Sequence, residues 1–362
     1  MISQQDRIAR WIRPDIRSLS AYHVPDPGGC IKLDAMENPY TWPQDVASAW
    51  LERLGRAELN RYPDPEARDL KRRLREVMGF PDSAGLLLGN GSDELIQMIA
   101  LAAAGAERCI LAPEPTFVMY RMIAVFAGMR YVGVSLRPDD FALDMPAMRA
   151  AIDAHQPAVI FLAYPNNPTG NLFPAGDVEE IIRHAPGLVV VDEAYAAFAS
   201  GSFLAWLDVF DNLLLLRTVS KMGLAGLRLG MLVGPTAWLA EIDKVRLPYN
   251  INVLTQISAA FALENHAVLD AQTARIRSDR EKLHAELAAM PEIEAFPSQA
   301  NFVLFRTPPG RASAVFEGLR SRRVLIKNMS GAGGLLSDCL RVTVGTPDEN
   351  RAFLEALRAC LA

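Results

Sequence analysis

Lys221 is the one lysine of this 362-residue chain that the sequence places beside a buried strand end. The other five lysines lie in stretches rich in polar or charged residues. Lys221 follows the strand pattern LLLLRTV after one residue, Ser220, and precedes the uncharged MGLAG. Open α/β sheets place ligand chemistry at such strand ends. A lysine there can be desolvated, lose its proton more readily and attack a carbonyl group; a solvated ammonium is the alternative.

Asp192 is a second reactive group at a predicted strand end. It follows the apolar run GLVVV, where a carboxylate is costly unless it meets a cation. Because Lys221 and Asp192 both end buried strands, they can converge on one crevice. An aldehyde cofactor with a pyridine ring needs both groups: the lysine forms a covalent link, and the aspartate keeps the ring nitrogen protonated. The alternative for Asp192 is a structural salt bridge or a helix N-cap.

A seat for an anion is predicted at GNGSDE (89–94), which precedes a helical pattern. Small residues before a helix N-terminus expose backbone N–H groups and the positive end of the helix dipole. The segment fits neither a Walker loop nor G-x-G-x-x-G, and an ordinary capped helix is the alternative. Ser220 and Arg228 flank the lysine loop and could close the seat. Asn167, in PNNPTG, is either part of a plain β-turn or an amide that points into the cleft.

Composition and charge exclude several classes of protein. The chain has 37 Lys and Arg against 42 Asp and Glu, a net charge of −5, which argues against nucleic acid as a main partner. The five histidines and four cysteines form no metal-binding or C-x-x-C pattern, so we expect no metal site and reduced thiols. The longest nearly apolar stretch, 95–106, is too short to span a bilayer, and the first residues lack an apolar segment. We therefore expect a cytoplasmic protein that is not bound to a membrane.

The elements that would position these groups alternate between helix and strand from residue 85 onward. Apolar, β-branched runs between helices are typical of a largely parallel sheet covered on both faces. After residue 248 the pattern changes to one long helical stretch, 253–287, and then to a small α+β tail. The last helix of this tail fits a capping box from Thr346 to Glu349, with Pro at its first position.

We expect an α/β protein with three parts. The first is an N-terminal arm (1–35) that packs on the small domain or on a partner subunit. The second is a large domain (36–250) that binds the cofactor on a mostly parallel sheet flanked by helices. The third is a smaller α+β C-terminal domain (251–362).

The chain resembles, over nearly its whole length, the aspartate-aminotransferase-like family of pyridoxal-phosphate enzymes, which have fold type I. Four segments carry the resemblance: GNGSDE (89–94), YPNNPTG (164–170), VVDEAY (190–195) and VSKMGLAGLRLG (219–230). The resemblance implies that Lys221 links to pyridoxal 5'-phosphate, that Asp192 pairs with the ring nitrogen, and that Tyr195 joins them as a catalytic residue. The other cofactor contacts that it implies are hydrogen bonds from Asn167 and Tyr195 to the phenolic oxygen, ring stacking by Phe117, and a phosphate site formed by Gly91, Ser92, Asp93, Ser220 and Arg228.

Within this family the chain is most similar to the histidinol-phosphate aminotransferases. The supporting segments are KLDAMENPY (32–40), LNRYPDPEARDL (59–70) and CLRVTVGT (339–346). The resemblance implies a homodimer in which Tyr62 reaches the neighbouring subunit's cofactor phosphate. It also implies substrate contacts from Tyr22, Glu37, Asn38, Lys327 and Arg341. Of these, Arg341 would bind the anionic group of the substrate.

Some of these contacts have structural alternatives. Arg341 could lie on a solvated face of its sheet, and Tyr22 and Glu37 could simply pack an N-terminal arm. The chain also departs from the family in three places. The loop from Lys221 to Arg228 is one residue shorter than in many members, Thr41 stands where glycine is frequent, and the loop at 331–334 is a bare GAGG.

The activity implied is transfer of an amino group between L-histidinol phosphate and 2-oxoglutarate, in histidine biosynthesis. Glutamate would charge the cofactor in the biosynthetic direction. The alternatives on the same fold are an aromatic amino-acid aminotransferase and a phosphothreonine decarboxylase. A cofactor-binding regulator without catalysis is disfavoured by the acidic charge balance and by the lack of a helix-turn-helix pattern before residue 30.

Overall fold

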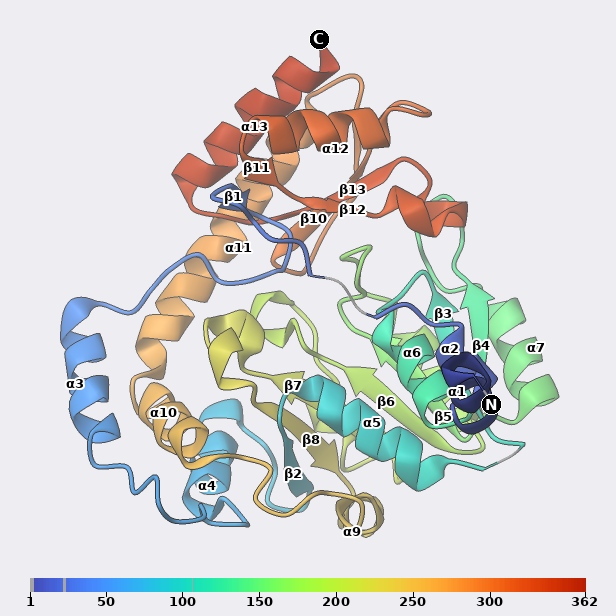
Figure 1. Cartoon of the computed structure of the whole chain (residues 1–362), viewed down its shortest axis with the longest axis vertical. Helices are drawn as coiled ribbons and strands as arrows, with labels where there is room; N and C mark the ends of the chain where they lie inside the picture. Colours follow the sequence, from blue (N-terminus) through green and yellow to red (C-terminus); the bar gives the residue numbers. More distant parts are fainter. Residues whose placement is uncertain (1–2, 22–23, 106) are drawn as a thin grey trace.

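The computed structural model describes residues 3–21, 24–105 and 107–362. Its main feature is a seven-stranded sheet with the strand order β2-β8-β7-β6-β5-β3-β4 (Figure 1). Every neighbouring pair is parallel except the two pairs that include β8. This confirms the predicted mostly parallel sheet. The strands are β2 (Gly85–Gly89), β3 (Cys109–Glu114), β4 (Arg130–Ser135), β5 (Val159–Ala163), β6 (Leu188–Asp192), β7 (Leu213–Thr218) and β8 (Gly230–Gly234).

Helices cover both faces of this sheet, because successive side chains of a strand point to opposite faces. Val189 and Val191 of β6 belong to one apolar cluster, and Val190 belongs to the other. The period of two therefore places Asp192 on the same face as Val190. The helices on that face are α5 (Ser92–Ala103), α6 (Met119–Phe126) and α9 (Thr236–Asp243); those on the opposite face are α4 (Arg68–Met78), α7 (Met145–His155), α8 (Ala175–His184) and α10 (Val253–Glu264).

A second, antiparallel sheet with the order β12-β13-β10-β9 forms the upper part of Figure 1. It shares an apolar cluster with three helices. Thr346 and Glu349 form the predicted capping box at the start of the last of them. The elements are β9 (Glu294–Ala295), β10 (Phe302–Arg306), β12 (Lys327–Asn328), β13 (Cys339–Thr343), α11 (His266–Ala288), α12 (Ala312–Ser321) and α13 (Pro347–Leu361), beside a two-stranded pair of β1 (Ile31–Lys32) and β11 (Val324–Leu325).

Two details of the elements were not predicted. The stretch 253–287 is helical without a strand, as expected, but it forms two helices, α10 and α11, which meet at Asn265 (φ −110°, ψ 26°). The Asn265 side chain donates to the Phe261 carbonyl at 2.9 Å, and such a local bond competes with the continuation of a helix. Strand β2 was not predicted, because GLLLG is a short run between two glycines at the sheet edge.

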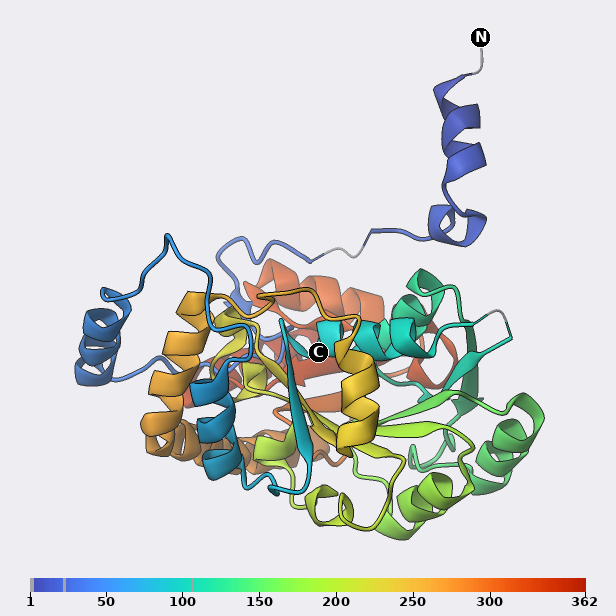
Figure 2. The ribbon, with the colours of Figure 1, turned by 90° about the horizontal axis from the view of Figure 1, so that it is seen from below.

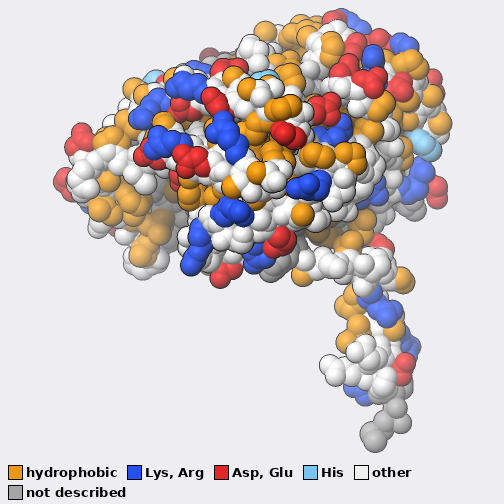
Figure 3. Space-filling view, turned by 90° about the horizontal axis from the view of Figure 1, so that it is seen from above, with side chains coloured by type: hydrophobic (Ala, Val, Ile, Leu, Met, Phe, Trp, Pro, Cys, Tyr) orange, Lys and Arg blue, Asp and Glu red, His pale blue; other side chains and the backbone are white. Residues whose placement is uncertain are grey.

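The N-terminal segment stands away from the rest of the protein (Figures 2 and 3). Its helices α1 (Gln4–Trp11) and α2 (Pro14–Arg17) contain no buried residue. Arg13 ties the segment to the end of α6 by donating to the carbonyls of Val125 and Phe126, at 2.7 and 2.9 Å. Helix α3 (Gln44–Leu54) follows further along the chain. The division at residues 35/36 and 250/251 stays a prediction.

Candidate active site

One cavity lies where strands β5, β6 and β7 end. Nine of the predicted cofactor residues line it, although they come from segments far apart in the chain. Parallel strands bring their carboxyl ends to one edge of the sheet, which explains this convergence. The nine are Ser92, Asp93, Phe117, Asn167, Asp192, Tyr195, Ser220, Lys221 and Arg228, and the rest of the lining is Met36, Ala163, Pro165, Ala194 and Thr218.

Asp192 is a buried carboxylate held by two hydrogen bonds. The Ala194 backbone N–H donates to Oδ1 at 3.0 Å, and the Tyr120 hydroxyl donates to Oδ2 at 2.7 Å. Burial raises the pKa of Asp192 to about 6, while both hydrogen bonds act in the opposite direction. The group is therefore largely ionised at pH 7 and can hold a proton on a ring nitrogen.

Lys221 belongs to a short 3-10 turn (Ser220–Met222) directly after β7. Its Nζ lies 3.5 Å from the Ala35 carbonyl oxygen and 5.8 Å from the centre of the Tyr195 ring. The pKa of Lys221 is lowered to about 8, mainly by burial and secondly by the charge of Arg341. This lysine gives up its proton more readily than an exposed one, as an amine that attacks an aldehyde requires.

The N-terminus of α5 forms one wall of the cavity. Gly91 precedes the helix with φ +89° and has no side chain to cap it. A Cβ at Gly91 would lie only 2.5 Å from Arg228 Nη2, and the positive φ at this position independently favours glycine. Arg228 Nη2 also lies 3.4 Å from Asp93 Oδ2.

Ser220 faces the same region and is fixed by Thr218. The Thr218 hydroxyl accepts from the Ser220 N–H at 3.1 Å and lies 2.8 Å from the Ser220 hydroxyl. Hydroxyls, a guanidinium and a helix N-terminus without a side-chain cap suit a phosphate group. With Asp192 and Lys221 in the same cavity, the residues present fit pyridoxal 5'-phosphate.

Asn167 connects this cavity with the second sheet. Its Nδ2 donates to the Tyr195 hydroxyl at 3.3 Å, and its Oδ1 accepts from Arg341 Nη1. Arg341, on β13, also donates to the Asp34 carbonyl at 3.2 Å and lies over the Phe302 ring. Only 6% of Arg341 is exposed, so the alternative of a solvated arginine on the sheet face is wrong. Lys327 of β12 is its register partner in the antiparallel pair.

Glu37, Asn38 and Tyr62 do not line the cavity of their own chain. The half-exposed Glu37 pairs with Lys32 at 2.6 Å. Asn38 donates to the Met222 carbonyl and to Gln272, both at 2.9 Å, and so supports the turn that carries Lys221. Tyr62 is 79% exposed and stacks on Tyr249. Tyr22 lies outside the described residues.

Three residues that belong to the site were not predicted from the sequence. Thr218 anchors Ser220, and Met36 lines the cavity. Tyr120 binds Asp192 from α6. It follows Phe117 by three residues in a helical pattern, a spacing that puts two side chains on one face and could have indicated it.

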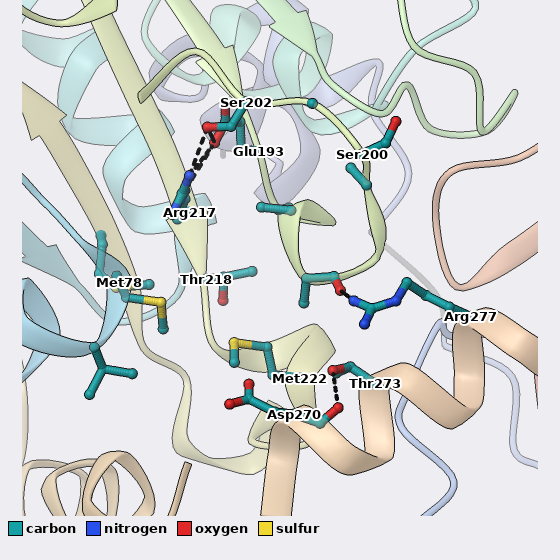
Figure 4. Close-up of a pocket in the computed structure, with 17 residues that line it drawn as sticks. Met78, Glu193, Ser200, Ser202, Arg217, Thr218, Met222, Asp270, Thr273 and Arg277 are labelled. Carbon is teal, nitrogen blue, oxygen red and sulfur yellow. Dashed lines mark hydrogen bonds and ion pairs between the residues drawn. The ribbon is translucent and has the colours of Figure 1, made fainter. Parts of the chain in front are cut away.

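A second cavity adjoins the first, with Ala194 and Thr218 in both linings (Figure 4). It lies between the end of α4, the loop after β6 and α11. Its buried charges are already paired: Glu193 Oε2 accepts from Arg217 Nε and Nη2 at 2.9 and 2.7 Å. Arg277 donates to the Ala197 carbonyl at 2.7 Å. These contacts hold the loop in place rather than leaving charges for a ligand.

Two kinds of feature are absent from the described residues. Nowhere in this part of the chain do three or more His, Cys, Asp or Glu side chains gather as they would around a metal ion. No helix in the same residues is both long enough and apolar enough to span a membrane.

The chain is similar to known proteins over its whole length. It is 59% identical to histidinol-phosphate aminotransferase 2 of Nitrosococcus oceani over 98% of both chains. It is 55% identical to histidinol-phosphate aminotransferase 2 of Cupriavidus pinatubonensis, over 98% of this chain and 97% of the relative. The crystal structure of histidinol-phosphate aminotransferase from Sinorhizobium meliloti in complex with pyridoxal-5'-phosphate matches 97% of each chain with a TM-score of 0.86 at 24% identity, which shows a common fold. The family model for aminotransferase class I and II matches residues 29–357, and this chain belongs to that family.

Proposed function

We propose that this chain is a pyridoxal-phosphate-dependent aminotransferase that moves an amino group between L-histidinol phosphate and 2-oxoglutarate. The observation that carries the proposal is the meeting of Lys221 and Asp192 in one cavity beside a seat for phosphate. The substrate pair is supported by relatives named for this activity, which are more than half identical along nearly all of the chain. Histidine biosynthesis is the pathway that this activity serves.

Each residue of the cavity would have its own role in this reaction. When bound, the cofactor supplies an electron-withdrawing ring that stabilises negative charge on the substrate carbon. Asp192 holds a proton on the ring nitrogen, and Lys221 carries the amine that links to the cofactor and then moves a proton at the substrate carbon. Asn167 and Tyr195 orient the ring through its oxygen, and Phe117 covers one face of it. The α5 N-terminus, Ser220 and Arg228 bind the phosphate.

The purified protein tests this proposal directly. With histidinol phosphate as the donor and 2-oxoglutarate as the acceptor, glutamate should form with the highest kcat/KM among the donors compared. Phenylalanine and phosphothreonine are the rival donors, and release of carbon dioxide from phosphothreonine would reveal a decarboxylase. A higher kcat/KM with either rival would overturn the substrate assignment.

Arg341 is expected to serve both half-reactions. Its guanidinium suits carboxylate and phosphate alike, whereas Lys327 adds a point charge that should matter more for the doubly charged phosphate. We expect Arg341→Ala to lower kcat/KM of both half-reactions by about ten- to a hundred-fold, the value of a lost hydrogen bond to a charged group. Lys327→Ala should lower the histidinol-phosphate half more than the glutamate half. Single-turnover absorbance measures each half separately.

Two variants serve as controls for this experiment. Arg358→Ala removes an exposed arginine of α13 and should change neither half-reaction. Arg341→Lys keeps a charge but loses the planar fork, so its effect should lie between those of wild type and Arg341→Ala. If kcat/KM of the glutamate half-reaction is unchanged in Arg341→Ala, another arginine binds that substrate.

The working unit that we propose is a homodimer. Leu59, Tyr62 and Leu247 are each more than 70% exposed, and the Tyr62 ring stacks on Tyr249 at 4.4 Å. The next residue, Asn250, donates to the Leu88 carbonyl at 3.1 Å and to Glu94 at 2.8 Å, so this apolar patch lies beside the phosphate seat. Burial of the patch against a second copy would bring that copy's Tyr62 to the seat.

The four cysteines are unpaired, which supports the cytoplasmic location that we propose.

Hybrid dimers test the contribution of Tyr62. Lys221→Ala and Tyr62→Ala proteins should each be inactive, but a hybrid has one site with both defects and one with neither. After full exchange of subunits an equal mixture should recover about a quarter of wild-type activity, since half the dimers are hybrids with one intact site each. A mixture of Lys221→Ala with Asp192→Asn is the control and should recover none. The absence of recovery despite proven exchange would place Tyr62 in its own chain's site.

A further inference from the structure

Tyr120 makes two contacts with the cavity although it does not line it. Its hydroxyl donates to Asp192 Oδ2 at 2.7 Å. The edge of its ring meets Phe117, with the ring centres 5.6 Å apart and an angle of 87° between the planes. Its other neighbour is Phe161 of β5, on which it stacks at 4.7 Å and 11°. One side chain of α6 therefore touches both the carboxylate and the aromatic ring that we expect to hold the pyridine ring.

The hydroxyl of Tyr120 is costly where it lies. The side chain is 0% exposed and belongs to the apolar cluster of α5, α6 and α9. A buried hydroxyl without a hydrogen bond is strongly unfavourable, and phenylalanine would fill the same space without that cost. Burial and the nearby Asp192 keep the pKa of Tyr120 well above its usual value, so the group stays a donor at every physiological pH. The bond to Asp192 gives the hydroxyl its partner.

We propose that Tyr120 is a positioning residue that fixes Asp192 and Phe117 around the ring of the cofactor. The Ala194 N–H holds Oδ1 and the Tyr120 hydroxyl holds Oδ2, so the plane of the carboxylate is set from two sides. The lone pairs of the Asp192 carboxylate that accept neither bond are then available to the ring nitrogen. The inference rests on the proposed function, since it concerns the same cofactor.

Tyr120 also governs the charge of Asp192. Asp93 from α5 and Glu193, the next residue, face Asp192 and raise its pKa, while the bonds from Tyr120 and Ala194 lower it. Tyr195 adds a neutral hydroxyl, because its own pKa is raised by burial. Removal of the Tyr120 hydroxyl should therefore raise the pKa of Asp192 above about 6. Only the ionised carboxylate holds the protonated ring nitrogen. On acidification, the variant without the Tyr120 hydroxyl should therefore lose the cofactor at a higher pH than the wild type does.

The test compares two tyrosine variants in cofactor binding to the apoenzyme. We expect Tyr120→Phe to weaken binding of pyridoxal 5'-phosphate about tenfold at pH 7. The acid limb of binding, the pH range in which affinity falls as the solution is acidified, should move up by about one pH unit. In the holoenzyme kcat should fall, with KM for histidinol phosphate unchanged. Tyr131→Phe is the matched control: Tyr131 is a half-buried tyrosine of β4, outside the cavity lining, and its variant should bind the cofactor as wild type does. The thermal midpoint of each apoenzyme verifies folding.

A double variant separates positioning from a general structural role. If Tyr120 acts through Asp192, adding Tyr120→Phe to Asp192→Asn should cause little further loss of cofactor affinity. Losses that add in full, or an unchanged affinity and pH profile in Tyr120→Phe, would overturn the inference. These binding measurements need no amino donor, so a failure of the proposed substrate assignment would be seen separately in the turnover assay.

Discussion

Lys221→Ala is expected to lose the covalent link to the cofactor and to lower turnover by about 10³-fold or more, because one amine serves as both nucleophile and proton carrier. Among the described residues no other lysine lines the cavity, so none can replace it. The wild-type protein should be yellow as purified, and the variant should lose the visible absorption band of the linked cofactor. Lys244→Ala is the control: this exposed lysine directly follows α9, and its variant should keep both colour and rate. Wild-type turnover in Lys221→Ala would refute the mechanism.

The pH dependence of cofactor uptake gives a second measure of the same residue. Only the neutral amine attacks an aldehyde, and the pKa of Lys221 is lowered to about 8. The neutral fraction rises as the pH rises, so the rate at which apoenzyme forms the covalent link should climb about tenfold per pH unit below 8 and level off above it. A rate that still climbs steeply near pH 10 would indicate an exposed lysine with its ordinary pKa.

The convergence of Lys221 and Asp192 could be predicted from the sequence because it depends on local rules. Each residue ends a run of buried apolar residues, and parallel strands bring such ends to one edge. The period of two then fixes the face to which Asp192 points, which is the face covered by α5 and α6. The position of the proposed phosphate seat was also predictable from a local rule, since the small residues 89–91 lie directly before α5, which begins at Ser92.

The contributions of Arg341 and Tyr120 could not be predicted in this way. Arg341 comes from the second sheet, and its contact with Asn167 depends on how the two sheets pack. Nothing in the alternation of CLRVTV distinguishes an arginine in a solvated position from a buried one. Tyr120 lies in the apolar run FVMYRMIAVF, where an aromatic residue is expected to pack and its hydroxyl gives no signal in the pattern. The spacing indicates only that Tyr120 shares a helix face with Phe117, and the hydrogen bonds of Tyr120 and Arg341 depend on tertiary contacts.

Tyr62 shows a different limit of sequence reasoning. In the single chain its ring is exposed and stacks on Tyr249, so neither the sequence pattern nor the fold of one chain indicates a contact with the cofactor phosphate. Its predicted role depends on a second copy of the chain. The same holds for the N-terminal helices, which stand away from the body and bury none of their residues.

Asp192→Asn is expected to retain part of its cofactor affinity but to lower kcat by about 10³-fold, which corresponds to about 4 kcal/mol of barrier. The phosphate seat and Lys221 remain, so the variant still binds and links the cofactor. The neutral amide cannot hold a proton on the ring nitrogen, and the ring becomes a poorer acceptor of electrons. The amide also has one oxygen where the carboxylate has two, so it cannot accept the bonds from Ala194 and Tyr120 on separate oxygens.

Two measurements and a control variant decide whether Asp192 acts on the cofactor or only supports the loop. Single-turnover kinetics give the loss in each half-reaction, and both should fall, because both need the same electron-withdrawing ring. Acid titration of cofactor binding should show a limb near pH 6 in the wild type, where the pKa of Asp192 is about 6, and no such limb in Asp192→Asn. Asp153→Asn, an exposed carboxylate of α7, controls for the loss of one negative charge. A loss below about threefold in kcat, or under 1 kcal/mol, together with an unchanged acid limb, would show that Asp192 is structural and that another group protonates the ring.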